Sequence, residues 1–552
     1  MIDDLWFKNA VVYSLDLDTF MDGDGDGVGD FSGLNRRLDY LHSLGVDTLW
    51  LAPFQPSPNR DNGYDITDYY GVDPRHGSSG DFVEFVQRAK SLGIRVIVDL
   101  VVNHTSDRHP WFQQARRDEN SRYRDWYVWS KKKPPRAHEG IVYPGTQTTT
   151  WTFDPLAKAY YHHRFHDFQP DLNIDNPEVR REIHRIMGYW LELGVAGFRV
   201  DSLPFVIESP PIGSGRPRQR FDVLALLREG LQWRAGNTVL LGEANVLPKE
   251  SERYFGKQGD GIHLMLNFHV NQHLFLALAN ADARPLAKAL LATRDVPFGA
   301  QWAQFLRNHD ELDLARLAER DRARVIERFA PDPDMQLYER GLRRRLAPML
   351  GDRRHLELAY SLLFALPGAQ VIRYGDEIGM GDDLAQPERE AVRTPMQWSA
   401  DRNAGFSTAK RIVQPVIRKG PYGYEHVNVE AQRRDPGSLL NWTAQLIRLR
   451  KECPEIGWGR LEPVATGNHS VIGFSYEWRD NRIVLLHNLA DRPVDIRMRL
   501  PEVRHLTNLM SAADDRTSPN GVFRMTLEEL GYRWLRCGTR AYGSSPAATA
   551  MV

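Results

Sequence analysis

The sequence predicts an α/β protein built on a parallel (β/α)₈ barrel, with a small insertion after the third strand and a separate antiparallel domain at the C-terminus. Three observations support this prediction. Short, almost continuous apolar runs recur along most of the chain, each followed by a longer amphipathic stretch. After the third run the chain turns polar and aromatic before the next helix. From about residue 463 the pattern changes to the alternation that is typical of antiparallel strands.

Eight apolar runs are candidates for strands that are buried on both faces, because such strands read as solid apolar segments. They lie at residues 11–13, 48–51, 96–102, 197–200, 239–241, 262–266, 302–306 and 370–374. The stretches between them have helical spacing. In residues 81–92, for example, Phe82, Phe85 and Val86 fall on one face. Eight strand–helix units in order favour a closed barrel, and a doubly wound open sheet is the alternative.

Two stretches interrupt this alternation and set the expected domain boundaries. The first contains KKKPPR and TQTTT, and the second is a charged helical insert near residues 311–360. We expect the first part of the barrel at 1–104, a small inserted domain at 105–172, the second part of the barrel at 173–460 and the C-terminal domain at 461–552. The small, polar end of the chain, GSSPAATAMV, is expected to fray.

Composition and charge exclude several classes of protein. The 552 residues are 42% hydrophobic, which is enough for a large core, and the charges sum to 71 − 72 = −1. A net charge near zero argues against a nucleic-acid binder and against a polybasic membrane anchor. No apolar run approaches ~18 residues, and MIDDLWFKNAVVY lacks the features of a signal peptide. Only Cys453 and Cys537 occur, so no disulfide framework is predicted and a cytoplasmic protein is expected.

An acidic, glycine-rich segment follows the first predicted strand. Its sequence, DGDGDGVGD over residues 22–30, places a carboxylate at nearly every second position. Such charges repel one another unless a cation lies among them, and hard oxygen ligands at this spacing suit Ca²⁺. An EF-hand loop begins similarly, but here Gly33 stands where that loop has Glu, and a solvated acidic turn is the alternative. The predicted ligands of this structural calcium ion are Asp22, Asp24, Asp26, the Val28 carbonyl and Asp30.

Acidic residues stand at or near the ends of the predicted strands. Asp201 ends GFRVD, Glu243 ends VLLGE and Asp310 ends FLRNHD. The carboxyl ends of barrel strands meet at one face, so we expect these side chains to converge, although a helix N-cap would explain any single one. Cleavage of a glycosidic bond needs one protonated and one ionised carboxyl group on either side of a sugar carbon. Arg199, on the same side of its strand as Asp201, is expected to keep Asp201 ionised.

With these residues the chain resembles the α-amylase family of glycoside hydrolases. DLVVNH, GFRVD, GEAN and FLRNHD look like four sequence regions of that family, in the same order, and the resemblance spans nearly the whole chain. NGYDITDYY, QPDLNIDNPEVR and VRTPMQWSADRNAGFS are most similar to members that interconvert maltose and trehalose. The resemblance implies a catalytic barrel, a small domain inserted after the third strand and a C-terminal β-sandwich. It also implies a disaccharide substrate, structural Ca²⁺ and no organic cofactor.

The resemblance further implies roles for individual residues. Asp201 would be the nucleophile that forms a glucosyl–enzyme intermediate, Glu243 the general acid and then base, and Asp310 the group that binds the distorted sugar. The implied substrate-binding residues are Tyr64, Asp65, His104, Gln169, Arg199, His309 and, near the entrance, Arg402. A second calcium site is implied at Asn103, Asp171, Phe205, Val206 and Glu208.

Two outcomes of the reaction stay open at this point. If the released glucose remains in the site and attacks through its anomeric hydroxyl, the product is trehalose. If water attacks, the chain is an α-glucosidase. The chain departs from the usual pattern at Val246 and Leu247 and over residues 208–220, where the acceptor glucose would lie. A catalytically silent relative is disfavoured because all three acids are present. The expected partner is the small substrate, with neither nucleic acid nor membrane, and a homo-oligomer stays open.

Overall fold

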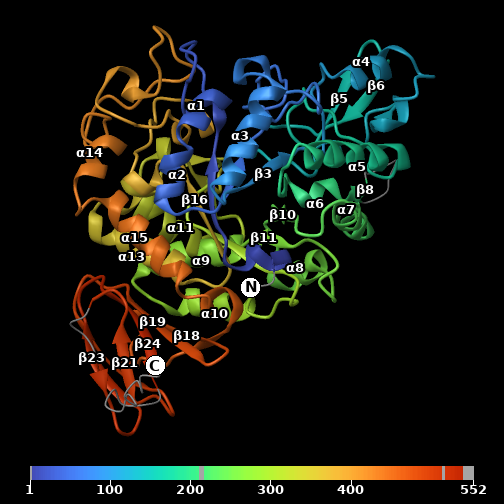
Figure 1. The fold of residues 1–552 in the computed structure, drawn as a ribbon. Helices are drawn as coiled ribbons and strands as arrows, with labels where there is room; N and C mark the ends of the chain where they lie inside the picture. The colour runs from blue at the N-terminus through green and yellow to red at the C-terminus, as the bar shows by residue number, and fades with distance from the viewer. Residues whose placement is uncertain (1–2, 210–216, 512–515, 539–552) are drawn as a thin grey trace, which may run out of the picture.

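A computed structural model describes residues 3–209, 217–511 and 516–538 (Figure 1). Eight parallel strands close into a barrel in the order β1-β16-β12-β11-β10-β7-β3-β2, so the predicted barrel is confirmed and the open sheet is wrong. The barrel strands are β1 (Val11–Leu15), β2 (Thr48–Leu51), β3 (Arg95–Leu100), β7 (Gly197–Val200), β10 (Val239–Gly242), β11 (Leu264–Leu266), β12 (Gln301–Phe305) and β16 (Ala369–Arg373). Almost every position in them is buried, which explains their solid apolar runs.

Helices surround the barrel and bury its outer face. They are α1 (Phe31–Arg36), α2 (Leu38–Leu44), α3 (Ser79–Ser91), α5 (Pro177–Glu192), α6 (Leu203–Val206), α7 (Asp222–Gln232), α8 (Pro248–Phe255), α9 (Phe268–Asn280), α10 (Arg284–Ala292), α13 (Arg353–Ala365), α14 (Val429–Arg434), α15 (Leu439–Lys451) and α16 (Glu455–Trp458). Helix α3 begins at a capping box in which the Ser78 and Asp81 side chains bond each other's backbone N–H groups. Its predicted apolar face, with Phe82, Phe85 and Val86, is buried.

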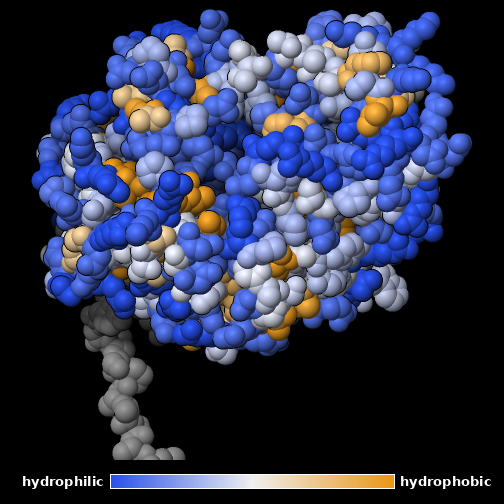
Figure 2. All heavy atoms as spheres, turned by 90° about the horizontal axis from the view of Figure 1, so that it is seen from above, coloured by the Kyte–Doolittle hydropathy of each residue, from blue (hydrophilic) through white to orange (hydrophobic). Residues whose placement is uncertain are grey.

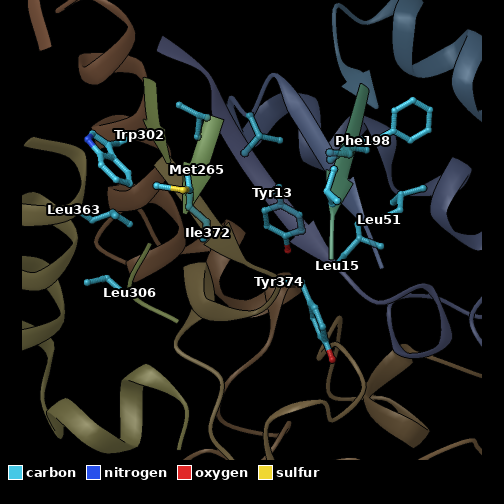
Figure 3. Close-up of a cluster of buried hydrophobic side chains, with 14 of the residues drawn as sticks. Tyr13, Leu15, Leu51, Phe198, Met265, Trp302, Leu306, Leu363, Ile372 and Tyr374 are labelled. Carbon is cyan, nitrogen blue, oxygen red and sulfur yellow. The ribbon is translucent and has the colours of Figure 1, made fainter. Parts of the chain in front are cut away.

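The core between strands and helices is close-packed around the barrel (Figure 3). Tyr13 and Leu51 of β1 and β2 belong to it, with Phe198 of β7 and Trp302 of β12. Leu363 packs against it from helix α13. This one continuous core fixes the loops at the carboxyl ends of the strands relative to one another.

A small subdomain is inserted between β3 and α5 and lies at the upper right of Figure 1. It contains α4 (Pro110–Arg117) and a three-stranded sheet of β4 (Trp129–Ser130), β6 (Ala159–His162) and β5 (Trp151–Asp154). The bridge between His104 and Asp171 ties its two ends to the barrel. A two-stranded ribbon of β8 (Glu208–Ser209) and β9 (Arg218–Gln219) follows α6.

The region after β12 is more mixed than the helical insert that was predicted. It contains helix α11 (Glu319–Phe329) and the short helix α12 (Leu346–Leu350). It also contains a three-stranded sheet of β13 (Leu312–Asp313), β15 (Gly341–Leu342) and β14 (Gln336–Leu337). These two-residue strands are too short to leave an alternation in the sequence.

The C-terminal domain consists of two antiparallel layers and lies at the lower left of Figure 1. One layer is β17 (Arg460–Pro463), β18 (Val471–Trp478), β19 (Asn481–Asn488), β24 (Tyr532–Gly538), β21 (His505–Asn508) and β22 (Arg516–Thr517). The other is β20 (Val494–Arg499) with β23 (Val522–Leu527). In β19, Ile483 and Leu485 join the core that contains the barrel, while Val484 and Leu486 join the core between the two layers. Both faces of this strand are therefore buried.

The surface seen from above is mostly hydrophilic, with hydrophobic residues in small separate patches (Figure 2). Among the described residues, no helix combines the length and the apolar character that a membrane crossing requires. The predicted fraying of GSSPAATAMV concerns residues that lie outside the described range.

Candidate active site

The carboxyl ends of the barrel strands bring the three predicted acids into one cavity. Asp201 directly follows β7, Glu243 directly follows β10, and Asp310 stands in the loop after β12. All three line a cavity of about 480 Å³. They are far apart in the sequence, and the closed order of the strands places them together.

One guanidinium joins the two acids on β7 and β10. Arg199 is fully buried, and its Nη1 donates to Asp201 Oδ1 at 2.9 Å and to Asp99 Oδ1 at 3.0 Å. Its Nη2 lies 2.7 Å from Glu243 Oε2. Asp201 and Glu243 therefore flank the same cation from two neighbouring strands.

Burial raises the proton affinities of both acids. It raises the pKa of Asp201 to about 6 and that of Glu243 to about 7, while Arg199 acts in the opposite direction on both. Because the two carboxyl groups interact, their titration belongs to the pair. Near neutral pH the pair holds its proton preferentially on Glu243, which is the arrangement that general acid catalysis needs.

Asp310 lies in a different electrostatic setting. Burial acts to raise its pKa, but the guanidinium groups of Arg389 above all, and of Arg393, outweigh burial and hold the pKa well below its usual range. Arg389 Nη1 lies 2.9 Å and Arg393 Nη2 3.1 Å from Asp310 Oδ1. Asp310 therefore stays ionised and can accept hydrogen bonds from sugar hydroxyls.

An aromatic pair forms part of the cavity wall. The rings of Tyr64 and His309 are stacked with centroids 5.7 Å apart, and Tyr64 Oη lies 2.9 Å from His309 Nε2. Tyr64 Oη also donates to Asp99 Oδ2 at 2.9 Å. Burial lowers the pKa of His309 to about 3, so this ring is neutral. A rigid neutral pair of this kind suits contact with the face and hydroxyls of a sugar.

His104 and Gln169 take different positions relative to the cavity. His104 lines it, with Nε2 3.1 Å from the Tyr64 carbonyl oxygen. Gln169 is fully buried, and its Nε2 donates to Asp61 Oδ2 at 2.8 Å. Asp61 itself lines the cavity, so Gln169 orients a group that the sequence analysis did not name.

The prediction for Asp65 is wrong. Its side chain does not line the cavity, because Ser57 Oγ and the Arg60 backbone N–H donate to its Oδ1 at 2.8 and 3.1 Å. Asp65 therefore braces the loop, and Asp61 occupies the cavity in its place. The segment DNGYD contains both aspartates, four residues apart. Its sequence does not indicate which of the two side chains points into the cavity.

The position expected for Arg402, near the entrance of the active site, stays a prediction. Arg402 is exposed in the turn η8 (Arg402–Gly405) and does not line the cavity. The turn packs against the glycine-rich loop, where the Asp22 backbone N–H donates to the Phe406 carbonyl at 3.1 Å. Arg389 and Arg393 are the arginines that pair with Asp310, and the second of them begins RTPMQW.

An aromatic and cationic cluster stands at the wall of the cavity, which Tyr143 and Arg389 line. Tyr143 of the inserted subdomain and Tyr338, between β14 and β15, pack with ring centroids 4.9 Å apart. The Arg389 guanidinium lies 5.4 Å from the Tyr143 centroid and 5.5 Å from the Tyr338 centroid. We call Tyr143, Tyr338 and Arg389 the roof. No sequence pattern predicted the roof, because its members come from three segments far apart in the chain.

The glycine-rich loop is built as a compact acidic turn. Carboxylate oxygens of Asp22, Asp24 and Asp30 lie within 4.8 Å of one another, and the charge of Asp24 adds to burial in raising the pKa of Asp30. Gly27 has φ +104°, and a Cβ there would lie 2.1 Å from the Arg411 carbonyl oxygen. Asp26 is exposed and accepts from the Val28 backbone N–H, and it is next to the three clustered acids without being one of them. The clustered oxygens fit a hard cation.

The second set of implied calcium ligands does not fit a metal as arranged. Asp171 is paired with His162 at 2.9 Å and accepts from Asn103 Nδ2 at 3.1 Å. Glu208 forms an ion pair with Arg164, whose guanidinium also lies over the Phe205 ring at 4.7 Å. Val206 is the remaining member of this set. A cation among these groups would have to displace Arg164. The second calcium site therefore stays a prediction. Residues 210–216 of the neighbouring segment lie outside the described range.

Comparison with known proteins places this geometry in context. The sequence matches the family described as "Alpha amylase, catalytic domain" over residues 16–459 and that described as "Sucrose hydrolase-like, C-terminal domain" over residues 481–536. A trehalose synthase of Thermus thermophilus is 46% identical over 496 residues, or 89% of this chain, and the chain spans only 51% of that relative's length. The trehalose synthase/amylase TreS of Mycobacterium tuberculosis is 39% identical over 555 residues, covering 99% of this chain and 92% of the relative. MutB, in an inactive form solved with isomaltulose, has a TM-score of 0.78 at 24% identity, covering 97% and 99% of the two chains, which shows the shared fold.

Proposed function

The chain belongs to the α-amylase family, and from this premise we propose that it interconverts maltose and trehalose by moving one glucosyl unit within the bound substrate. The observation that carries the proposal is the pairing of Asp201 and Glu243 on the single guanidinium of Arg199, inside one cavity. The names of the relatives from Thermus thermophilus and Mycobacterium tuberculosis support the choice of substrate.

The reaction proceeds in two displacements. An oxygen of Asp201 attacks the anomeric carbon of the non-reducing glucose, while Glu243 gives its proton to the departing glycosidic oxygen. The products of this step are a glucosyl ester on Asp201 and a free glucose. The free glucose then attacks the ester carbon through its own anomeric hydroxyl, and Glu243 takes back the proton as Asp201 leaves. Atoms and charge balance, and trehalose is formed without water.

The electrostatic setting of each residue supports its step. Glu243, with the higher pKa of the pair, begins as the acid, and Asp201 begins ionised beside Arg199. Asp310 is held ionised by Arg389 and Arg393, so it binds hydroxyls of the donor glucose as positive charge develops on the sugar.

The roof supports transfer over hydrolysis. A glucose released inside a covered cavity is retained, and water has less access to the ester of Asp201. Hydrolysis of maltose to glucose is the second candidate function, because the mycobacterial relative carries the name amylase as well. The cavity wall beyond Glu243 includes Val246 and Phe268, apolar groups that would bound the acceptor glucose.

Analysis of the products from maltose tests the proposal. The purified chain is incubated with maltose, and separately with trehalose, and the sugars are separated over time by chromatography. We expect trehalose as the main early product from maltose and maltose from trehalose. Glucose as the sole product would overturn the transfer and leave the α-glucosidase. A variant D201A that is folded and retains full activity would overturn the assignment of the nucleophile.

A calcium ion in the glycine-rich loop forms a separate part of the proposal. Asp22, Asp24 and Asp30 would hold it, with Asp26 and the Val28 carbonyl closing the set, and it would stabilise the loop without entering the chemistry. We expect chelation to lower the melting temperature and added Ca²⁺ to restore it. The D22N variant should lose this response. A wild-type melting temperature that changes with neither chelator nor Ca²⁺ would contradict the calcium site. A cytoplasmic location and a homo-oligomer stay predictions.

A further inference from the structure

The wall of the active-site cavity carries a charged pair, Asp313 and Arg340, that the steps described above do not use. Both residues line the cavity. Asp313 lies three residues after Asp310 in the chain, and Arg340 Nε is 3.8 Å from Asp313 Oδ1. The guanidinium also reaches Glu311, with Arg340 Nη2 3.5 Å from Glu311 Oε1. The pair therefore presents opposite charges side by side at one part of the wall.

Two short antiparallel strands hold this pair in place. Asp313 of β13 is paired with Gly341 of β15, and Arg340 directly precedes Gly341. The Leu314 backbone N–H donates to the Arg340 carbonyl oxygen at 3.0 Å. A Cβ on Gly341 would lie 2.5 Å from Glu311 Cγ, so the two strands approach each other closely here. The pair is thus built on a fixed backbone, which suits the binding of a rigid ligand.

Asp313 is also joined to the segment that follows Glu243. Asn245, two residues after Glu243, donates through Nδ2 to Asp313 Oδ2 at 2.8 Å. Arg316 Nη2 donates to the Asn245 carbonyl oxygen at 3.0 Å, and Gln272 Nε2 donates to Asn245 Oδ1 at 3.3 Å. In the proposed reaction Glu243 protonates the oxygen that joins the two glucose units. A residue bonded to the segment directly after Glu243 therefore lies on the side of the second, acceptor glucose.

The pair has unused hydrogen-bonding capacity. A carboxylate offers about four lone-pair sites, and that of Asp313 accepts from Asn245 and, at 2.8 Å, from the Ala315 backbone N–H. Among the described residues, no group accepts a hydrogen bond from Arg340 Nε, although this atom is buried. Spare acceptors beside spare donors match the hydroxyls of a sugar, since a hydroxyl both donates and accepts.

A vicinal diol is the part of a glucose ring that spans a carboxylate and a guanidinium. One hydroxyl donates to the carboxylate while its neighbour accepts from the guanidinium. When the acceptor glucose presents O4 to the ester, as in the formation of maltose, its C1 and C2 hydroxyls lie at the far end of the ring. When it presents O1, as in the formation of trehalose, its C3 and C4 hydroxyls lie there. One pair can therefore hold the ring in either orientation.

Resting on the glucosyl transfer proposed above, we infer that Asp313 and Arg340 bind the acceptor glucose by a vicinal diol in both of its orientations. The pair thereby determines specificity on the acceptor side: it retains the released glucose beside the ester of Asp201 and lets it attack through O1 or O4. Water has no diol and gains nothing from the pair. Asn245 is a positioning residue, because it acts through Asp313.

The partition of the glucosyl ester between glucose and water tests the role of the pair. The purified chain is given p-nitrophenyl α-glucoside as donor and increasing concentrations of glucose as acceptor. Released p-nitrophenol counts the esters formed, and chromatography measures the trehalose and maltose made from them. In the wild type the transferred fraction should rise with glucose to a plateau. We expect D313N and R340M to raise the glucose concentration at half of this plateau at least tenfold, because each variant removes one charge of the pair.

Two further variants serve as controls. Glu339 directly precedes Arg340, is exposed and does not line the cavity, so E339Q makes the same acid-to-amide change beside the pair. This variant should leave the half-saturating glucose concentration unchanged. R340K, which retains a cationic donor, should raise that concentration by less than about threefold.

Deoxy sugars test the two orientations without any substitution in the protein. As an acceptor, 2-deoxyglucose lacks one member of the C1–C2 diol, so the wild type should form mainly the 1,1-linked product from it. The C3–C4 diol is incomplete in 3-deoxyglucose, so the wild type should form mainly the 1,4-linked product from that sugar. In D313N these opposite preferences should disappear.

Separate outcomes overturn the inference and the proposed function. A half-saturating glucose concentration that is unchanged in either D313N or R340M, with transfer retained, would overturn the inference. The same conclusion would follow if E339Q shifted it as much as D313N, or if the wild type made the same mixture of linkages from both deoxy sugars. A wild type that releases p-nitrophenol but forms neither trehalose nor maltose at any glucose concentration would instead overturn the proposed function.

Discussion

Arg199 sets the chemistry of the site at the scale of single residues. It is fully buried and pairs with Asp99, Asp201 and Glu243 at once. A buried guanidinium stays charged, so it supplies a fixed positive field that lowers the pKa of both carboxyl groups, against the burial that raises it.

The pH dependence of activity follows from these two groups. Asp201, with a pKa of about 6, must be ionised, so kcat/KM should fall as the pH drops below that value. Glu243, with a pKa of about 7, must be protonated, so kcat/KM should also fall as the pH rises above it. Initial rates on maltose across both limbs measure this bell shape. E243Q should lose about 10²–10⁴-fold in rate and lack the alkaline limb, and an alkaline limb that persists in E243Q would assign it to another group.

The positions of Asp61 and Asp65 predict opposite effects of the same substitution. D61N removes a charged hydrogen-bond acceptor from the cavity, which is worth about 1.5–3 kcal/mol, or roughly 10- to 100-fold in kcat/KM. D65N disturbs the buried contacts with Ser57 and Arg60, so it should lower the melting temperature while changing kcat/KM by less than about threefold. Kinetics and thermal melts of both variants decide the matter, and a kinetic defect confined to D65N would reverse the assignment.

Sequence patterns located the strand-end acids but not the residues of irregular loops. Asp201 and Glu243 end buried strands, whose direction is fixed by the barrel, so their side chains could be placed in advance. Asp65 lies in a loop whose backbone is set by its own hydrogen bonds, and there the sequence could not decide between Asp61 and Asp65 as the group in the cavity. Arg389 and Arg393 were missed because one turn carries both of them to Asp310 across about 80 residues of chain.

At the scale of elements, the roof brings together three segments that lie far apart in the sequence. The inserted subdomain supplies Tyr143, the short sheet after β12 supplies Tyr338, and η7 supplies Arg389. This part of the cavity wall therefore depends on how the aromatic and cationic groups of the three segments pack against one another.

Removal of one roof ring should shift the products toward hydrolysis. Y143A opens the cavity to water and lets the released glucose escape, so the ratio of glucose to trehalose formed from maltose should rise at least about tenfold. Product analysis at early times measures this ratio. Y160A, which removes the same ring from β6 of the same subdomain, away from the cavity, should leave the ratio unchanged. Equal product ratios in Y143A and the wild type would show that the roof does not control the access of water to the glucosyl ester.

The regular elements were the most predictable part of the molecule. All eight predicted apolar runs overlap barrel strands, because strands covered on both faces leave an unbroken apolar signal. The short strands β13, β14 and β15 were missed, since two residues are too few to show a period. The apolar run in β19 belongs to an antiparallel sheet that is buried on both faces, as Ile483 and Val484 show by joining different cores.

At the scale of the whole molecule, the C-terminal domain is bound to the barrel through a shared core. Trp534 of β24 is fully buried in the core that contains the barrel, and its Nε1 donates to Ser361 Oγ of α13 at 2.9 Å. Tyr476 Oη of β18 donates to the Ala365 carbonyl oxygen at 3.0 Å. These contacts make the sheet and helix α13 one packing unit.

This shared core predicts cooperative unfolding. W534A should destabilise the protein by about 3–5 kcal/mol and move a single calorimetric transition to lower temperature. W233A, at a tryptophan that is 83% exposed, should leave the transition in place. Two separate transitions in W534A, with the larger one unshifted, would show that the barrel and the C-terminal domain are stable independently.

The triple pairing of Arg199 also constrains how this enzyme can change. Any replacement of Asp99, Asp201 or Glu243 redistributes the field felt by the other two, so the effects of such replacements will not add. Protein engineers who aim at a more acidic working range therefore gain little by adjusting these positions one at a time. Asp310 depends on a separate pair of arginines, so replacements around that pair can change its setting without touching the contacts of Arg199 with Asp201 and Glu243.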